Sequence, residues 1–206
     1  MLSHRTTFAL FFGNRRMFPA SCIQEARRDL PATLESMGYK TLMLPENATN
    51  LGAVETLEEA QVYANFLQQN AGKFQGIILC LPNFGDETGA VGSLTRANVP
   101  IFVQAYPDDL NSMNIDQRRD AFCGKLCIMD VFHQHGVKFT AMMPHVVAPQ
   151  SSAFNSNIDH FASVCRVVTS IRGLVVGAIE ARTTAFKTVR IDEVALQRNG
   201  ITVETI

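Results

Sequence analysis

The stretch from residue 76 to 86, Gly-Ile-Ile-Leu-Cys-Leu-Pro-Asn-Phe-Gly-Asp, decides the fold of this chain. Residues 77–81 form a short unbroken apolar run, which suits a parallel strand covered on both faces. The run stops abruptly at Pro82, and its shortness and this stop favour a strand over a buried helix. Asn83, Asp86 and Glu87 follow at the carboxyl end of the strand, the edge at which open α/β sheets bind ligands.

Strand-like and helix-like patterns alternate through the rest of the chain. The predicted strands are 8–12, 41–44, 76–81, 99–103, 137–142, 174–178 and 201–203. The predicted helices are 23–37 with a kink or a split at Pro31, 57–67 behind a capping box of Thr56 and Glu59, 90–97, 114–132 capped by Asn114, 158–171 and 192–198. This alternation predicts an α/β fold, a three-layer Rossmann-like or flavodoxin-like parallel sheet with helices on both faces. We assign residues 1–160 to this domain, and 161–206 to a linking helix and the first βα unit of a second α/β domain.

Composition narrows the class of protein. The 206 residues are 47% hydrophobic and 18% charged, with a formal net charge of -1, which is an ordinary globular profile. The near-zero charge argues against nucleic acid or an anionic membrane as the main partner. No apolar run is long enough to span a bilayer, and the five cysteines, odd in number and mostly in apolar surroundings, indicate reduced thiols. We therefore expect a cytoplasmic protein.

Polar side chains follow the carboxyl ends of four predicted strands, and parallel strands bring those ends to one edge. They are Asn14, Arg15 and Arg16; Asn83, Asp86 and Glu87; Gln104, Asp108 and Asp109; and Glu180 and Arg182. Amides, carboxylates and arginines in fixed directions suit hydroxyl-rich ligands such as sugars, and Phe18, Phe84 and Tyr106 add ring faces. Two alternatives remain open: α/β loops are polar in any case, and Arg15 and Arg16 are either ligand contacts or surface salt bridges.

The helix around residue 125 carries further candidates. Lys125 lies beside a strand-end loop and either reaches the pocket or stays in solvent. Cys123 and Cys127 have the wrong spacing for a redox Cys-x-x-Cys, and a second pair for zinc is lacking. We expect these two thiols to be packed in the core. A Gly-x-Gly-x-x-Gly motif does not follow the first strand, so an NAD site is not supported.

Five blocks of sequence together resemble the N-terminal part of the L-fucose/L-arabinose isomerase family, in particular its fucose-isomerase-like proteins. The blocks are Leu-Pro-Asn-Phe-Gly-Asp-Glu (81–87), Pro-Ile-Phe-Val-Gln-Ala-Tyr-Pro-Asp-Asp (100–109), Arg-Arg-Asp-Ala-Phe-Cys-Gly-Lys (118–125), Phe-Ala-Ser-Val-Cys-Arg-Val-Val (161–168) and Gly-Ala-Ile-Glu-Ala-Arg-Thr-Thr-Ala-Phe-Lys-Thr-Val-Arg (177–190). The resemblance implies aldose–ketose isomerisation by proton transfer through an enediol, with Mn²⁺ holding the sugar oxygens. It also implies a homo-oligomer in which strand-end loops contact the sugar at a neighbouring subunit's active site.

The resemblance places substrate contacts in the Arg15-Arg16 loop and the Asn83-Phe84 loop, and our full substrate-binding set adds Asp86, Tyr106 and Lys125. It places the metal-binding residues in a later part of the family's sequence, so we assign none here and expect this chain to be inactive without a complementing C-terminal half. Glu180 matches no metal ligand that we can place. The alternative is a stand-alone module that binds a sugar or metabolite without catalysis.

Overall fold

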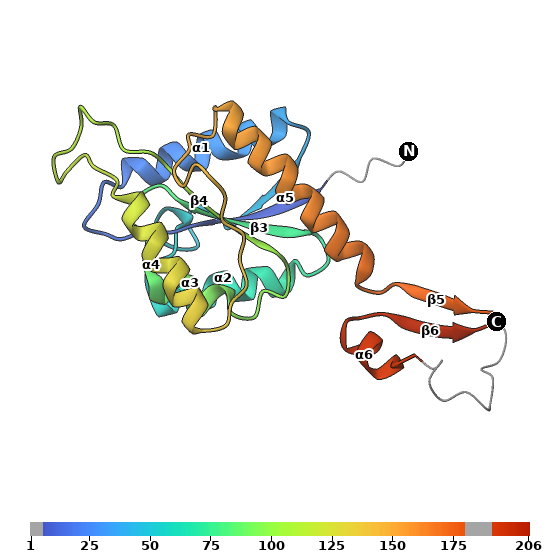
Figure 1. Ribbon diagram of the computed structural model, residues 1–206. Helices are drawn as coiled ribbons and strands as arrows, with labels where there is room; N and C mark the ends of the chain where they lie inside the picture. The colour runs from blue at the N-terminus through green and yellow to red at the C-terminus, as the bar shows by residue number, and fades with distance from the viewer. Residues whose placement is uncertain (1–5, 180–190) are drawn as a thin grey trace. The chain divides into compact units, whose positions relative to one another are not determined.

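A computed structural model describes residues 6–179 and 191–206 (Figure 1). In chain order the elements are β1 Thr7–Phe12, α1 Ser21–Ser36, β2 Lys40–Met43, the 3₁₀ turn η1 Asn50–Gly52, α2 Leu57–Gln69, β3 Gly76–Leu81, α3 Glu87–Leu94, β4 Ile101–Ala105, α4 Ala121–Gln134, α5 Ser152–Ile171, β5 Val175–Ala178, α6 Glu193–Arg198 and β6 Thr202–Thr205. The chain divides into two compact units, Met1–Cys165 and Arg166–Ile206, and the boundary falls within α5. None of the described helices combines the length and apolarity that crossing a bilayer requires.

The first unit is built on a sheet of four parallel strands in the order β2-β1-β3-β4. Phe12 pairs with Cys80 and Leu81 pairs with Ala105, so β1, β3 and β4 end at nearly the same level. The chain moves from β1 outward to β2, and then crosses to the other side of β1 for β3 and β4. This reversal makes the gap between the carboxyl ends of β1 and β3 the switch point, where α/β sheets bind ligands.

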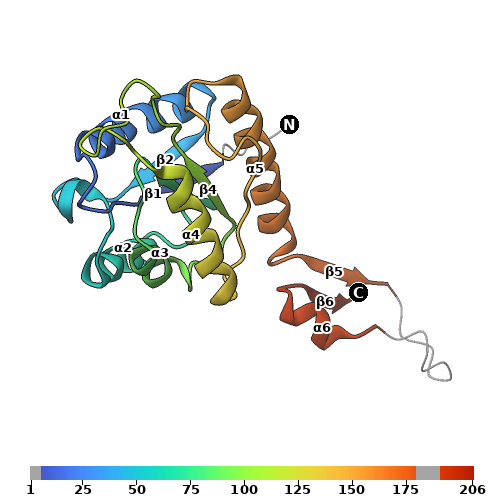
Figure 2. The ribbon, with the colours of Figure 1, turned by 60° about the vertical axis from the view of Figure 1, so that its left-hand side comes forward.

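Helices cover both faces of this sheet, which confirms the predicted three-layer α/β fold (Figure 2). Alternate residues of β3 separate the two layers, because side chains of a strand point in turn to opposite faces. Ile77 and Leu79 pack in the core with α2, α3 and α4, whereas Ile78 and Cys80 pack in the core with α1 and α5. Burial of the whole of β3 explains why its sequence is an unbroken apolar run.

Local signals account for several element ends. Thr56 and Glu59 form the predicted capping box: the Thr56 hydroxyl accepts the Glu59 N–H at 3.2 Å, and the Glu59 carboxylate accepts the Thr56 N–H at 3.2 Å. Gly38, with a φ of +88°, stops the chain from continuing α1. Of the kink or split predicted at Pro31, the split is wrong, since α1 is continuous from Ser21 to Ser36. Leu30 and Leu34 are both fully buried, so core packing holds the turns on each side of the proline.

Two predictions between β4 and α5 are also wrong. Residues 137–142 form only an isolated parallel bridge, Thr140 with Phe102, instead of a fifth strand. Phe139 still packs against the core. The apolar pattern of this segment therefore indicated burial correctly, but it did not determine whether the backbone would pair with a strand. The helix expected from Asn114 begins at Ala121, because Asp108 accepts the N–H groups of Arg119 and Asp120 and holds the end of the preceding loop against β4.

The second unit contains a two-stranded parallel sheet of β5 and β6 with α6 between them in sequence. The side chain of Asp192 caps α6 by accepting the Ala195 N–H at 3.0 Å. This strand–helix–strand order is the one predicted for the end of the chain. Glu180 and Arg182, two of the polar residues singled out in the sequence, lie outside the described residues.

Candidate functional site

The loops after β1 and β3 are joined by Asn83, a side chain with no solvent exposure. Its Oδ1 accepts the backbone N–H of Arg15 at 3.2 Å and that of Gly85 at 3.1 Å. Its Nδ2 donates to Oδ1 of Asn14 at 2.9 Å. A single amide therefore uses both of its polar atoms to hold the two loops at the switch point of the sheet.

Arg15 lies across the two loops. Its Nη2 pairs with Oδ2 of Asp86 at 3.3 Å and also with the carboxylate of Glu87. The guanidinium carbon lies 4.5 Å from the centre of the Phe84 ring, and that ring stacks on Phe18 with centroids 5.8 Å apart. The charge of Arg15 is therefore already balanced by two carboxylates, and its stem and plane are packed against an aromatic pair.

Arg16 and Glu55 form the neighbouring part of the rim. Glu55 accepts the Arg16 backbone N–H at 2.7 Å, pairs with Nε of Arg16 at 3.5 Å, and accepts Nδ2 of Asn14 at 3.2 Å. The Arg16 side chain is 70% exposed, compared with 29% for Arg15. Arg16 is therefore the more accessible donor of the two, while Glu55 continues the network begun by Asn83.

Asp86 has a second role at the start of α3. Its Oδ1 accepts the N–H groups of Thr88 at 2.8 Å and Gly89 at 3.1 Å, so it is the N-cap of that helix. Its other oxygen remains for Arg15. The helix thus fixes the direction of one carboxylate that faces the loop after β1.

Sequence reasoning missed Arg119, which lies at the end of the loop after β4. Its Nη1 donates to the Pro82 carbonyl at 3.0 Å, its Nη2 pairs with Glu25, and its guanidinium carbon lies 5.0 Å from the centre of the Tyr106 ring. The Tyr106 hydroxyl is buried, and burial raises the pKa of this residue. The sequence signal that could have pointed to Arg119 was its place in the block 118–125, one of those that carry the family resemblance. The sequence analysis instead placed Arg119 within the helix expected at 114–132.

Lys125 is buried, so neither reading of it as a solvated or a loop-contacting lysine describes its position in α4. Its Nζ donates to the His145 carbonyl at 2.8 Å, which ties α4 to the segment before α5. Burial lowers the pKa of this ammonium group to about 8, from an ordinary value of 10.5.

The N-terminal part of α4 approaches the loop after β3 very closely at Gly124. A Cβ at this position would lie 1.7 Å from the Phe84 carbonyl oxygen, so only glycine permits the contact. The neighbouring thiols do not behave as expected, because Cys123 is exposed and Cys127 is half-buried. The core-facing side of the helix is taken by Ala121, Gly124 and Ile128, which turns the two cysteines outward.

Of the seven predicted substrate-binding residues, the structure gathers Arg15, Arg16, Asn83, Phe84 and Asp86 at the switch point. Tyr106 lies at the same sheet edge beneath Arg119. Lys125 instead binds the His145 carbonyl. We call the first five residues, with Asn14, Glu55 and Glu87, the rim. Its chemistry is that of fixed amide, carboxylate and guanidinium groups beside an aromatic face, which suits hydrogen bonding to hydroxyls.

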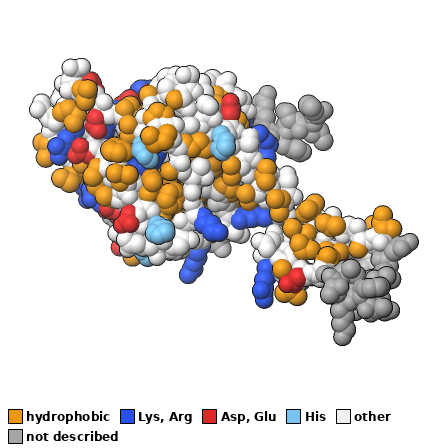
Figure 3. Space-filling model, viewed as in Figure 1, with side chains coloured by type: hydrophobic (Ala, Val, Ile, Leu, Met, Phe, Trp, Pro, Cys, Tyr) orange, Lys and Arg blue, Asp and Glu red, His pale blue; other side chains and the backbone are white. Residues whose placement is uncertain are grey.

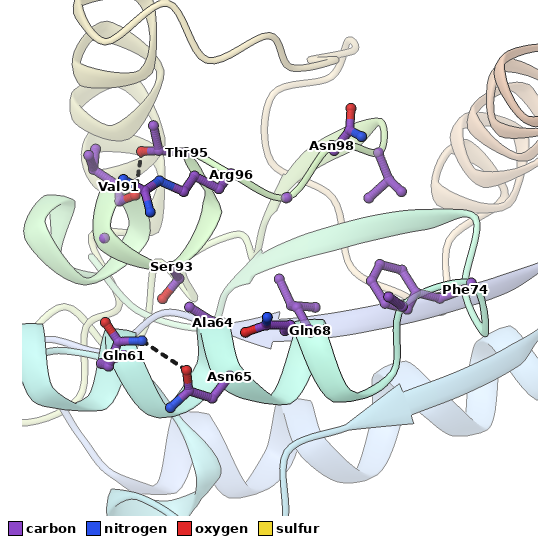
Figure 4. A pocket seen from close by; sticks show the side chains of 16 residues that line it. Gln61, Ala64, Asn65, Gln68, Phe74, Val91, Ser93, Thr95, Arg96 and Asn98 are labelled. Carbon is purple, nitrogen blue, oxygen red and sulfur yellow. Dashed lines mark hydrogen bonds between the residues drawn. The ribbon is translucent and has the colours of Figure 1, made fainter. Parts of the chain in front are cut away.

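Two further observations limit the chemistry that the described residues can perform. Among residues 6–179 and 191–206, no group of three or more His, Cys, Asp or Glu side chains is placed to hold a metal ion. A separate groove, with a cavity volume of about 870 Å³, lies between α2 and the end of α3. Figure 4 shows Gln61, Asn65 and Gln68 on one wall and Ser93 and Arg96 on the other. Phe74 and Val99, which also line it, precede β3 and β4, so this groove lies at the opposite sheet edge from the rim.

The chain is similar to one known protein family over most of its length. The model of the fucose/sulfoquinovose isomerase N-terminal domain matches residues 9–172. No individual curated protein matches the chain. The matched region includes β1 from Ala9 onward, β2 to β4, the helices that cover these strands and every rim residue. The chain therefore belongs to the fucose/sulfoquinovose isomerase family, through the N-terminal domain of that family.

Proposed function

We propose that this chain supplies the substrate-holding rim of an aldose–ketose isomerase. The observation that carries the proposal is the junction at Asn83, which holds the loops after β1 and β3 together at the switch point in a chain of a sugar isomerase family. The rim offers Arg16 and the outer edges of Arg15 and Asp86 to hydroxyl groups, with Phe84 beside them. We assign to these residues binding and orientation of the sugar.

We further propose that the sugar is neutral, as fucose is, and not sulfonated, as sulfoquinovose is. Four arginines around the sheet edge have a carboxylate partner: Arg15 with Asp86 and Glu87, Arg16 with Glu55, Arg118 with Asp120, and Arg119 with Glu25. Arg27, at the same edge, instead donates to the Leu44 and Gly52 carbonyls. Asp108 adds a further carboxylate, which accepts the backbone N–H groups of Arg119 and Asp120. Because carboxylates outnumber guanidinium groups, a sulfonate would meet net repulsion, whereas hydroxyls find both donors and acceptors.

Family membership suggests that Mn²⁺ takes part in the complete enzyme. A divalent metal would polarise the sugar carbonyl and stabilise the developing enediolate charge. The described residues do not fit such an ion, because they assemble no group of three ligands. We therefore propose that the metal ligands come from elsewhere in the assembled enzyme and that the described residues alone do not isomerise a sugar.

We propose that the chain acts as a homo-oligomer, or with a complementing polypeptide that carries the metal ligands. Large apolar side chains are exposed on α4 and in the segments beside it: Phe122 and Leu126, each 44% exposed, Leu110 at 86%, and Met143 at 70%. Figure 3 shows hydrophobic side chains gathered over α4 and the loop before it. A surface of this kind is typical of a protein–protein contact.

The cytoplasm is the compartment that we propose. All five cysteines are free thiols, as expected where thiols are kept reduced. The formal net charge of -1 provides no general attraction to nucleic acid or to an anionic membrane. A small sugar therefore remains the proposed ligand.

The proposal is tested by titrating the ¹⁵N-labelled chain with L-fucose and, separately, with sulfoquinovose. We expect L-fucose to shift the amide resonances of Arg15, Asn83 and Gly85, and we expect weaker shifts with sulfoquinovose. A Phe84→Ala variant should lose the L-fucose response, while Gln68→Ala in the groove between α2 and α3 should keep it. No response to either sugar, or a response confined to the groove, would refute the rim as a sugar site. A stronger response to sulfoquinovose would leave the rim standing and refute the preference for a neutral sugar.

A sugar-binding module without catalysis is the second candidate, and the absence of a three-ligand group among the described residues favours it. The two candidates differ in what a larger assembly does. If the chain completes an isomerase, adding a polypeptide that carries the family's later domains should produce Mn²⁺-dependent ketose from aldose. If it is a binding module, sugar binding persists and the added polypeptide produces no ketose. If this chain alone converted an aldose to a ketose, both candidates would be contradicted, because each assumes that the described residues do not hold the catalytic metal.

A further inference from the structure

Two thiols stand together on the outer face of α4. Cys123 and Cys127 are four residues apart, so a regular helix places them one above the other on the same face. Cys123 is exposed and Cys127 is half-buried, whereas Cys22, Cys80 and Cys165 are buried. Solvent therefore reaches two thiols that share one face of α4.

The helix keeps this pair from closing into a disulfide. Residues four apart on a helix have Cβ atoms about 5–6 Å apart, whereas a disulfide needs Cβ atoms about 3.8 Å apart. Closing the bond would require α4 to unwind between the two residues. Gly124 lies in that turn and is packed directly against the Phe84 carbonyl, which leaves no room for such a movement. The two sulfur atoms can more easily be bridged by a third atom.

The kind of bridging atom follows from the ligands. Thiolates are soft ligands that select soft ions such as Cu(I) over Mg²⁺, Ca²⁺ or Mn²⁺. Tetrahedral zinc needs four ligands, and structural zinc sites supply all of them from protein. The described residues provide no third His, Cys, Asp or Glu side chain at this place, so a centre that is satisfied by two sulfur ligands fits best.

We propose that Cys123 and Cys127 form a surface dithiol site for a soft metal ion of low coordination number, Cu(I) being the one with two-sulfur chemistry that cells contain. Binding releases one proton from each thiol and forms two metal–sulfur bonds, with no change of oxidation state. The site is independent of the proposed sugar chemistry. It is adjacent to the rim, because Gly124, which lies between the two cysteines, packs against the Phe84 carbonyl.

The first test titrates the reduced chain with Cu(I) under nitrogen in competition with a chromophoric Cu(I) chelator. We expect one ion per chain. Cys123→Ser and Cys127→Ser should each weaken binding by about 100-fold or more, because the second sulfur then no longer adds an intramolecular bond. Cys165→Ser, which removes a buried thiol, should bind Cu(I) as the unaltered chain does, once circular dichroism has shown that it is folded.

A spacing variant separates a paired site from two independent thiols. Cys127→Ser combined with Asp130→Cys keeps two exposed thiols on α4, but moves them seven residues, or about 10.5 Å, apart along the helix. It should bind Cu(I) as weakly as Cys127→Ser alone. Equal affinity of the spacing variant and the unaltered chain would overturn the proposal, as would Cu(I) binding that survives both serine substitutions.

Phenylarsine oxide gives an independent readout. One molecule joins two thiols with loss of one water, so intact-mass analysis should show one phenylarsenic group per unaltered chain and none on either serine variant. If the arsenical joins the pair but Cu(I) does not bind, the geometry stands and the assignment to a metal ion is overturned. If neither reagent joins Cys123 to Cys127, the dithiol site itself is refuted.

Discussion

The Nδ2 atom of Asn83 donates a hydrogen bond to Oδ1 of Asn14 at 2.9 Å, and this contact connects the ends of β3 and β1. The two residues are 69 positions apart in sequence, so only the parallel pairing of the strands brings them together. Asn14 in turn donates to Glu55, which extends the contact to the loop before α2. The switch point of the sheet is therefore closed by side-chain amides and not left as an open gap.

Asn83→Ala should destabilise the chain by about 2–4 kcal/mol, because it leaves the buried N–H groups of Arg15 and Gly85 and the Asn14 oxygen without this partner. Urea denaturation followed by circular dichroism measures the change. Asn65→Ala, on the exposed face of α2, is the matched control and should change stability by no more than about 0.5 kcal/mol. Equal effects of the two substitutions would show that the junction contributes little.

Gly124→Ala should also destabilise the fold, although alanine is the better helix former. The gain in helix propensity is about 1 kcal/mol, but the new Cβ would lie 1.7 Å from a backbone oxygen, which must move. We expect a net loss of about 1–3 kcal/mol and altered amide resonances at Phe84 and Gly85. Gly92→Ala in α3 should lose less, because its nearest neighbours are the side chains of Ala60 and Leu57 at 3.0 and 3.3 Å. A stabilised Gly124→Ala variant would contradict the close contact between α4 and the loop.

Lys125 should make stability depend on pH in the alkaline range. Burial lowers its pKa to about 8, whereas the unfolded chain keeps the ordinary value of 10.5. Below about pH 8 both states hold the proton; from there to about pH 10.5 only the unfolded state does. The free energy of unfolding should therefore rise with pH across that window, by up to about 3 kcal/mol for this group, since one pKa unit is worth about 1.4 kcal/mol.

The measurement for Lys125 is the difference in unfolding free energy between the unaltered chain and Lys125→Met at pH 7, 8.5 and 10. The two proteins share every other group that titrates in this range, so the difference cancels the contribution of those groups. Lys73→Met is the control, because that lysine is exposed in the segment after α2 and should show no such trend. A difference that stays constant with pH would mean that Lys125 is not held in a desolvated site.

Removing the two carboxylates that face Arg15 should change which sugar the rim prefers. Asp86→Asn with Glu87→Gln frees the guanidinium charge, and asparagine still caps α3. We expect the affinity for sulfoquinovose relative to L-fucose to rise by about tenfold, equivalent to about 1.4 kcal/mol. Isothermal titration calorimetry at low salt measures this ratio. Glu35→Gln with Asp130→Asn makes the same net change in charge away from the rim, so a similar rise in that variant would point to overall charge instead of the Arg15 contacts.

Features that depend on neighbours in sequence were predicted well. The apolar run at 77–81 predicted a strand buried on both faces, and the Thr56–Glu59 capping box predicted the start of α2 within one residue. The grouping of Arg15, Arg16, Asn83 and Asp86 followed from a general rule, since carboxyl ends of parallel strands meet at one edge. Each of these signals lies within one turn or one strand.

Features that depend on contacts between residues distant in sequence were not predicted well. Arg119 reaches Pro82 and Glu25, which are 37 and 94 residues away, so nothing in its local sequence marked it. The outward turn of Cys123 and Cys127 depends on Gly124 meeting the Phe84 carbonyl. The expected fifth strand had a strand's composition, but its backbone pairs with β4 only at Thr140.

The sequence by itself therefore determined the α/β class, the order of the elements apart from the strand expected at 137–142, and the edge at which polar loops gather, because hydrophobic period, caps and turns act over a few residues. The tertiary structure decided which of those polar groups remain available to a ligand. Arg15 pairs with the carboxylates of Asp86 and Glu87, Asn83 is a buried residue that connects two loops, and Lys125 is a buried cation. The reason is that burial and pairing depend on which distant loops pack together, and that packing follows from the sheet order.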